Sequence, residues 1–180
     1  EDAHYITSTA DSLATATYGG RYVFASLDQK TLSGQFRMDY SLTSSLSLQL
    51  FVQPLVSSGS YSGYRELARP GTYDFLVYGT GGSTIDLANG TADPDGAGGA
   101  PPVNLRPNGG PNDFNRRTVR GNAVLRWEYA PGSTFYLVWT QERTGDDPTG
   151  DSHFGSSLSE LGRTPANNIV MVKVAHHFEL

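Results

Sequence analysis

The histidines of this chain are candidates for binding a metal ion or transferring a proton near neutral pH. The chain has four of them: His4, His153, His176 and His177. His176 and His177 are adjacent in a segment with strand-like alternation, so they point to opposite faces and cannot form one two-histidine ligand set. No further ligand cluster accompanies them, and the chain has no cysteine. We therefore expect no metal and no cofactor.

Serines are the second chemical possibility, because a Ser-His-Asp arrangement could be assembled from the many serines of the chain. A nucleophile-elbow motif would place one serine on a sharp turn between a strand and a helix, and the sequence contains no such motif. An outer-membrane hydrolase stays an open alternative, without a candidate catalytic residue.

Aspartates in loops rich in glycine and proline could offer oxygen ligands to calcium. The Asp-Pro-Asp-Gly stretch that begins at Asp93 lacks the remaining spacing of an EF-hand loop. Asp, Pro and Gly are also ordinary turn-forming residues, so turn structure is the favoured interpretation. The aspartates concerned are Asp93, Asp95, Asp146, Asp147 and Asp151.

Charged residues also occur within segments that alternate apolar and polar positions. Side chains on a strand have a period of two, so each such segment separates an apolar face from a polar face. The charged residues of these segments all fall on the polar face, where they could line a water-filled path or a plugged interior. The polar positions, predicted to face the lumen of a barrel, are Arg37, Asp39, Gln49, Arg126, Glu128 and Lys173.

Composition narrows the class of protein. The formal net charge is -5 and the isoelectric point is about 5.2, which argues against a nucleic-acid partner. The chain has no 18-residue apolar window for a transmembrane helix, whereas its 21 Gly, 10 Pro, 10 Tyr and 8 Phe suit strands and turns.

Two alternating segments, residues 32–42 and 46–56, are joined by only three residues. If this turn sets the register, Tyr40 pairs with Leu48, Met38 with Leu50 and Phe36 with Val52, which unites the apolar faces. Each arm has about the 9 to 11 residues that a tilted strand needs to cross a bilayer. The sequence therefore predicts a membrane-spanning β-hairpin here.

A second hairpin is predicted from residues 119–129 and 135–139, with Pro131, Gly132 and Ser133 as the turn. Pairing through that turn places Trp127 beside Leu137. A third hairpin is predicted within residues 73–87, and a final strand over residues 170–180. Long polar stretches near 57–71, 89–117 and 144–168 are predicted to be external loops, because outer-membrane barrels alternate short periplasmic turns with longer external loops.

A soluble β-sandwich binding module is the alternative explanation of the alternation. Two features favour the membrane barrel over this alternative. The apolar faces are about twice as long as a common globular strand, and aromatic residues lie near the short turns. Three basic residues turned toward lipid would cost on the order of 10 kcal/mol, so the apolar face must point outward. The predicted lipid-facing wall comprises Leu32, Phe36, Met38, Tyr40, Leu48, Leu50, Val52, Leu125, Trp127, Leu137, Trp139, Val172 and Val174.

Four stretches resemble the C-terminal barrel domain of a bacterial family of unknown function. They are RYVFASLDQKTLSGQFRMDYSLTSSLSLQLFVQPLVSSGSY from Arg21, YDFLVYG from Tyr73, RGNAVLRWEYAPGSTFYLVWTQERTG from Arg120 and NNIVMVKVAHHFEL from Asn167. In that family the barrel typically follows a domain similar to family-nine carbohydrate-binding modules. The resemblance implies an outer-membrane location and a larger parent barrel, and it supplies no catalytic residues.

We therefore predict an all-β, antiparallel transmembrane β-barrel, with residues 1–180 as a single segment of a larger barrel; a small closed barrel is the alternative. The expected location is the outer membrane of a Gram-negative bacterium. The expected partners are membrane lipid and, through a domain outside this chain, glycans. The expected function is that of a membrane anchor or channel for a carbohydrate-binding-like or surface domain.

Overall fold

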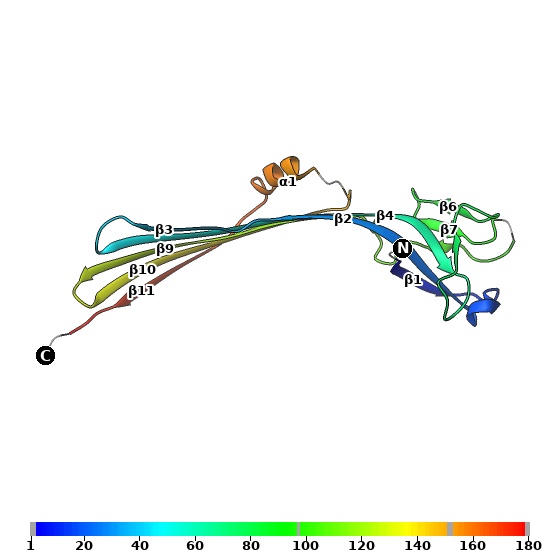
Figure 1. The fold of residues 1–180 in the computed structure, drawn as a ribbon, viewed down its shortest axis with the longest axis horizontal. Helices are drawn as coiled ribbons and strands as arrows, with labels where there is room; N and C mark the ends of the chain where they lie inside the picture. The colour runs from blue at the N-terminus through cyan, green and yellow to red at the C-terminus, as the bar shows by residue number, and fades with distance from the viewer. Residues whose placement is uncertain (1–2, 97, 151–152, 179–180) are drawn as a thin grey trace. The chain divides into compact units, whose positions relative to one another are not determined.

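The computed structural model describes residues 3–96, 98–150 and 153–178, and these are almost entirely strands and connections (Figure 1). The predicted all-β antiparallel fold is confirmed. The strands are β1 (His4–Ala10), β2 (Gly20–Ser33), β3 (Phe36–Ser41), β4 (Leu46–Leu67), β5 (Phe75–Val77), β6 (Thr84–Asp86), β7 (Thr91–Asp93), β8 (Val103–Asn104), β9 (Phe114–Ala130), β10 (Ser133–Asp147) and β11 (Asn167–Ala175).

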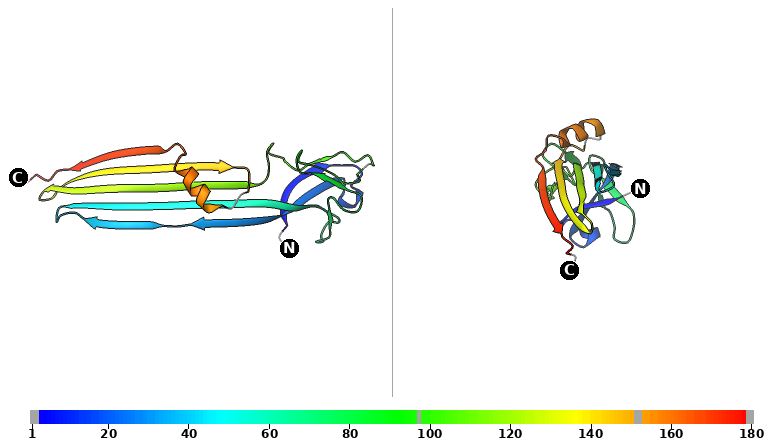
Figure 2. Two further views of the ribbon diagram at one scale, coloured as in Figure 1. Left: turned by 90° about the horizontal axis from the view of Figure 1, so that it is seen from above. Right: turned by 90° about the vertical axis from the view of Figure 1, so that its left-hand side faces the viewer.

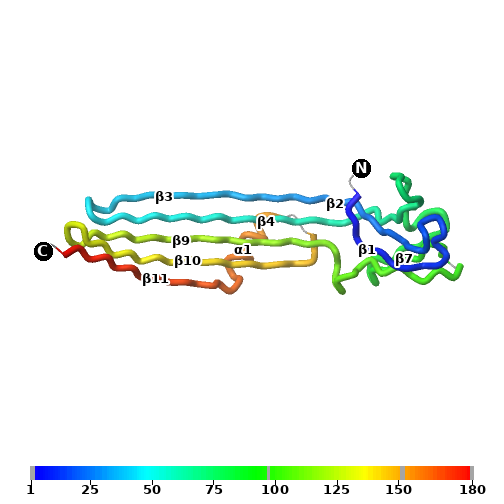
Figure 3. The backbone as a smooth tube through the Cα atoms, turned by 90° about the horizontal axis from the view of Figure 1, so that it is seen from below, coloured from blue at the N-terminus to red at the C-terminus, as the bar shows by residue number. Residues whose placement is uncertain are grey.

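The large sheet has the strand order β1-β2-β4-β9-β10-β11, with β3 and β5 also paired to β4. Figure 3 shows β3, β4, β9, β10 and β11 side by side in this order. Among the described residues β1 and β11 end the sheet and do not pair with each other, so the sheet is open.

The chain forms two compact units. Unit 1 comprises Glu1–Gln29, Gly59–Phe114 and Pro148–Asp151, and unit 2 comprises Lys30–Ser58, Asn115–Asp147 and Ser152–Leu180. The long strands β2 and β4 each contribute residues to both units.

In unit 2 the first hairpin has the predicted register. Phe36 pairs with Val52, Met38 with Leu50 and Tyr40 with Leu48. The break between β2 and β3 lies opposite Pro54, whose carbonyl accepts a hydrogen bond from the Gly34 amide at 3.1 Å. Because proline has no N–H, it cannot return that bond, and the ladder is interrupted at this point.

The second hairpin of unit 2 differs from the prediction by two residues. Trp127 pairs with Phe135 rather than with Leu137, and Leu125 pairs with Leu137. The turn has two residues rather than three, with Gly132 at φ +70°, and the register shifts between Ser133 and Thr134. A bulge adds one unpaired residue to a strand, so the apolar faces still coincide.

The last strand, β11, begins at Asn167, three residues before the predicted start, and ends at Ala175. It pairs with β10, with Val174 opposite Phe135 and Val172 opposite Leu137. The prediction for residues 179 and 180 lies outside the described residues.

Several segments that were predicted to be loops form strands instead. Residues 57–67 belong to β4 and not to a loop. A Cβ atom at Gly59 would lie 2.5 Å from the Phe114 ring and 2.9 Å from Leu27, so this glycine permits close packing rather than a turn. The third predicted hairpin does not form, because β5 pairs with β4 whereas β6 pairs with β7.

The predicted loop 89–117 contains β7 and β8, which form a second sheet with β6 and help to enclose the core of unit 1. Its buried residues are Val23, Ala25, Tyr64, Tyr78, Ala92, Val103 and Leu105. Long-range pairing of two- and three-residue strands leaves little local periodicity, which explains why the sequence pattern indicated a loop.

The predicted loop 144–168 is also partly ordered into regular structure. Strand β10 continues to Asp147, and a short helix, α1 (Phe154–Leu161), precedes β11. A 3-10 turn, η1, covers Thr15–Thr17. In the described part of the chain, no helix has the length and apolar character needed to cross a membrane.

Candidate functional site

One face of the unit 2 sheet, which we call the apolar face, carries the large apolar side chains in register. Cross-strand pairing places Val52 opposite Phe36 and Trp139 opposite Ala123. The side chains stay accessible: Phe36 is 66% exposed, Val172 60% and Trp139 43%. The face comprises Leu32, Phe36, Met38, Tyr40, Leu48, Leu50, Val52, Ala123, Leu125, Trp127, Leu137, Trp139, Val172 and Val174. Such a large exposed apolar surface usually marks a binding or membrane surface, so a proposed function must account for it.

The opposite face, which we call the polar face, carries ion pairs between neighbouring positions. Arg116 Nε lies 2.8 Å from Asp146, and Arg120 Nε lies 2.8 Å from Glu142, both between strands β9 and β10. Because these pairs are solvent-exposed, each contributes little to stability. What matters for the function is their location, because these charged side chains lie on the polar face and not on the apolar face.

The polar positions selected from the sequence share this face. Arg37 pairs with Asp39 at 3.3 Å and Arg126 with Glu128 at 3.5 Å. The Lys173 ammonium lies 5.9 Å from the centre of the Tyr136 ring, and Gln49 stands opposite Asp39 in the ladder. These polar positions therefore lie together on one face of the sheet, and their ion-pair partners were not predicted from the sequence.

Helix α1 covers one end of the apolar face, and Figures 1 and 2 show it over β9 and β10. Arg117 forms an ion pair with Glu160, and Arg143 donates to the carbonyl oxygen of Gly162. The Asn115 amide donates to Ser157 Oγ at 3.1 Å. Charged and amide side chains therefore begin where α1 covers the sheet, and they end the apolar face there. This helix was not predicted from the sequence, although Phe154, Leu158 and Leu161 have helical spacing.

At the short-turn end of the sheet, a serine hydroxyl contacts a histidine ring. Ser133 Oγ lies 3.2 Å from His176 Nδ1, and it accepts a hydrogen bond from the His177 amide at 3.0 Å. Ser133 is only 1% exposed. A nucleophile must be accessible to substrate, so this arrangement ties the β9–β10 turn to the chain after β11 and gives the hydrolase alternative no support.

Aromatic rings surround this tie. Tyr129 stacks on His176 at 6.1 Å between centroids and contacts its Nδ1 at 3.0 Å through the hydroxyl. Phe178 meets His176 edge-on at 4.5 Å, and Trp127 meets Tyr129 at 5.9 Å. The apolar face therefore ends at its short turns in aromatic side chains, and at its other end in α1 with its arginine contacts.

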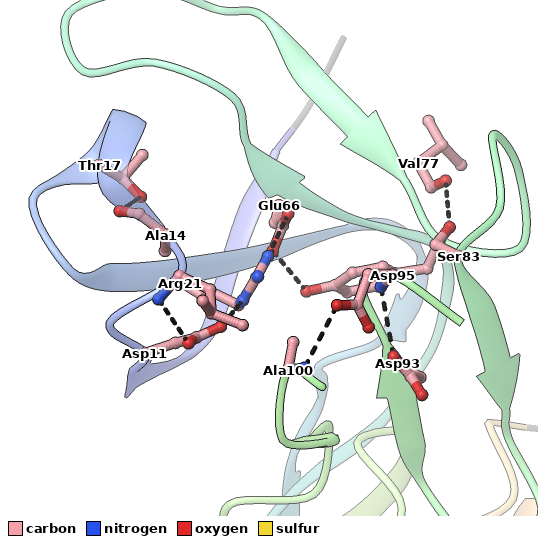
Figure 4. A network of polar contacts seen from close by, with 12 residues as sticks. Asp11, Ala14, Thr17, Arg21, Glu66, Val77, Ser83, Asp93, Asp95 and Ala100 are labelled. Carbon is pink, nitrogen blue, oxygen red and sulfur yellow. Dashed lines mark hydrogen bonds and ion pairs between the residues drawn. The ribbon is translucent and has the colours of Figure 1, made fainter. Parts of the chain in front are cut away.

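The loop aspartates act mainly as turn acceptors. Asp93 Oδ1 accepts from the Gly96 amide at 2.9 Å. It also accepts from the Asp95 amide, and Asp95 Oδ2 accepts from the Ala100 amide, both at 3.2 Å (Figure 4). Asp146 pairs with Arg116, and Asp151 lies outside the described residues. Among the described residues no group of three or more His, Cys, Asp or Glu side chains is placed to hold a metal ion.

Unit 1 contains a network of charged side chains, mostly inaccessible to solvent, that no sequence pattern predicts (Figure 4). Arg21 lies 2.5 Å from Asp11 and 2.7 Å from Glu66, and the Tyr78 hydroxyl donates to Glu66 at 3.1 Å. The Leu13 amide and Arg21 lower the pKa of Asp11, while burial raises the pKa of Tyr78. All four groups are satisfied by one another, which is typical of a network that holds the fold together.

These observations define the class of the protein: an open antiparallel β-sheet protein whose long strands separate an exposed apolar face from a charged face. The chain belongs to the family described as a domain of unknown function (DUF5916), whose model matches residues 2–180. No curated protein and no solved structure matches the chain.

Proposed function

We propose that unit 2 is a section of the wall of an outer-membrane β-barrel in a Gram-negative bacterium, with its apolar face toward lipid. The observation that carries the proposal is the separation of the faces. Apolar side chains stay accessible on one face, where Phe36 is 66% exposed and Leu137 36%, whereas the ion pairs occupy the other. In a barrel wall, the apolar face would contact lipid and the charged face would contact the polar interior of the barrel.

The length of the apolar face supports a membrane of ordinary thickness. On β9 the apolar positions run from Val119 to Tyr129. Ten steps of about 3.4 Å, inclined at about 40°, rise roughly 26 Å along the membrane normal. The apolar band of outer-membrane barrels is about 25 Å tall. Arg117 and its contact with α1 lie just beyond one end of this length.

Aromatic and basic residues at the two ends also fit this proposal. Tyr129, Trp127 and Phe178 lie near the short turns, where aromatic side chains belong at a membrane–water boundary. Arg143 marks the other boundary together with α1. A soluble sandwich would instead need a second layer over these exposed apolar residues.

The resemblance of the chain to barrel domains suggests the wider role. We propose that the barrel anchors, or serves as a channel for, a carbohydrate-binding-like surface domain encoded elsewhere in the full-length polypeptide. Membrane lipid is then the direct partner of this chain, and glycans are partners of that other domain.

Fractionation of the native protein tests the proposal. We expect the protein in the outer-membrane fraction, resistant to carbonate extraction, and migrating faster on gels before heating than after heating. Its intact mass, measured on the same sample, distinguishes a larger parent barrel from a self-contained chain of 19.4 kDa. Recovery of a monodisperse protein in the soluble fraction without detergent would refute the membrane proposal.

A further inference from the structure

The apolar face of unit 2 is hollowed at one place. A groove of about 290 Å³ lies over β4, β9 and β10, and its surface is almost wholly carbon. We call it the wall groove. Its lining is Leu50, Phe51, Val52, Val119, Gly121, Asn122, Ala123, Trp139 and Gln141.

Two small residues create the wall groove. Gly121 and Ala123 are successive residues of the apolar face on β9, between Val52 on β4 and Trp139 on β10. A Cβ atom at Gly121 would lie 3.4 Å from the Phe51 carbonyl oxygen and 3.7 Å from Val52 Cγ2, both ordinary contacts. A methyl group therefore fits at Gly121, and the small residues Gly121 and Ala123 leave the hollow.

The polar groups at one end of the wall groove are already occupied. Asn168 Oδ1 accepts hydrogen bonds from Trp139 Nε1 at 3.1 Å and from Gln141 Nε2 at 3.0 Å. This pair of bonds holds the indole at the side of the groove. Arg143, two residues beyond Gln141 on the same face, donates to the carbonyl oxygens of Gly162 and Thr164. The groove thus has a carbon interior and a polar end at Gln141, and the cation of Arg143, opposite Val119, lies just beyond that end.

We propose that the wall groove binds one acyl chain of a membrane lipid, with the head group at the Gln141–Arg143 end. This inference rests on the proposed membrane location. A peptide would bring backbone N–H and C=O groups that find no free partners in a carbon surface, whereas an acyl chain has none to satisfy. The charge of Arg143 complements an anionic head group at the end where the apolar face stops.

The volume agrees with a single chain. Small-molecule sites usually measure about 300 to 1,000 Å³, so this groove is at the lower limit and accommodates part of one extended tail. Bound in this way, the tail would replace the missing side chains at Gly121 and Ala123 and complete the outer wall.

The test compares lipid retention between variants of the full-length protein. Ala123→Leu fills the groove, and Val172→Leu adds a similar apolar group to the same face on β11, outside the groove. The protein is extracted in mild detergent, and native mass spectrometry measures the fraction that carries a co-purified lipid. Binding of phosphatidylglycerol is then titrated into the delipidated protein.

We expect Ala123→Leu to weaken phosphatidylglycerol binding roughly tenfold, the change expected when about two buried methylene contacts are displaced. Val172→Leu should bind as the wild type does. Gly121→Ala, which adds one methyl group, gives a graded intermediate effect and replaces Ala123→Leu if that variant does not assemble.

A second readout follows the groove directly. In vesicles of dioleoylphosphatidylcholine with a minor fraction of brominated phosphatidylglycerol, quenching of Trp139 is obtained as the difference between the wild type and Trp139→Phe. We expect Ala123→Leu to reduce this quenching. Equal lipid binding by all variants, or an equal loss in Val172→Leu, would overturn the inference while outer-membrane fractionation still holds. A soluble protein would overturn the proposed function itself.

Discussion

Replacing Leu50 with arginine tests which face of the sheet meets lipid. Leu50 lies on the apolar face of β4, opposite Met38 and four residues from Leu46 at the short turn. Four steps of about 3.4 Å at a tilt of about 40° place it roughly 10 Å from that end, near the middle of a band about 25 Å tall. The position is therefore close to the deepest point of the proposed wall.

An arginine facing lipid at this depth costs about 2 to 4 kcal/mol. Since about 1.4 kcal/mol corresponds to a factor of ten, Leu50→Arg should lower the folding equilibrium constant in vesicles about 30-fold to 700-fold. The assay is a reversible guanidinium titration of the full-length protein in lipid vesicles, followed by the gel shift between folded and unfolded forms.

Gln49→Arg is the matched control, because it places the same side chain one residue away on the polar face. Gln49 pairs with Asp39, so the new arginine gains an opposite charge across the ladder, worth about 0.2 to 1 kcal/mol. We expect this variant to be as stable as the wild type or slightly more stable. Equal losses in the two variants, or a larger loss in Gln49→Arg, would refute the assignment of the faces.

Three further predictions concern the polar contacts. Ser133→Ala removes the buried acceptor of the His177 amide and should lower the free energy of unfolding by about 1 to 3 kcal/mol, measured by denaturant titration; unchanged stability would mean that the tie is unimportant. Arg21→Met leaves the carboxylates of Asp11 and Glu66 without their shared cation and should lower the free energy of unfolding much more than Arg116→Gln, which removes an exposed pair; similar losses in the same titration would contradict the argument from accessibility. The pKa of Asp11 is lowered in the folded state, so its carboxylate supports folding above its unfolded pKa of about 3.9 and loses this effect as the pH falls through the lower folded value. Asp11→Asn should therefore show a smaller loss of stability between pH 4 and lower pH than the wild type, and an identical acid profile would contradict the assigned shift.

Local alternation was sufficient to predict the faces of unit 2. Because side chains on a strand alternate strictly, the sequence places Phe36 and Val52 on one face and Arg37 on the other, whatever the rest of the chain does. A three-residue turn between two matching arms also determined the register of the first hairpin. The second hairpin was predicted with the correct faces but with pairs displaced by two residues, because a bulge next to Gly132 has no period of its own.

Alternation along the sequence did not predict the short strands or the segments that resemble loops in composition. Residues 57–67 contain serines and glycines that indicate a loop, yet they continue β4, because neighbouring strands supply their backbone hydrogen bonds and the Phe114 ring needs the space at Gly59. The same applies to β7 and β8, which are defined by pairing between segments distant in the sequence.

The sequence by itself therefore determined the class of fold, the two faces of the long strands and the placement of charge on one of them, since all three follow from a period of two along the chain. The tertiary structure alone decided the position of α1, the Arg21 network and the wall groove. Each of these depends on which side chains come together from different strands. Trp139 and Val52, for example, line the wall groove on either side of Ala123 and Gly121, and such neighbours across strands produce no periodic pattern in the sequence.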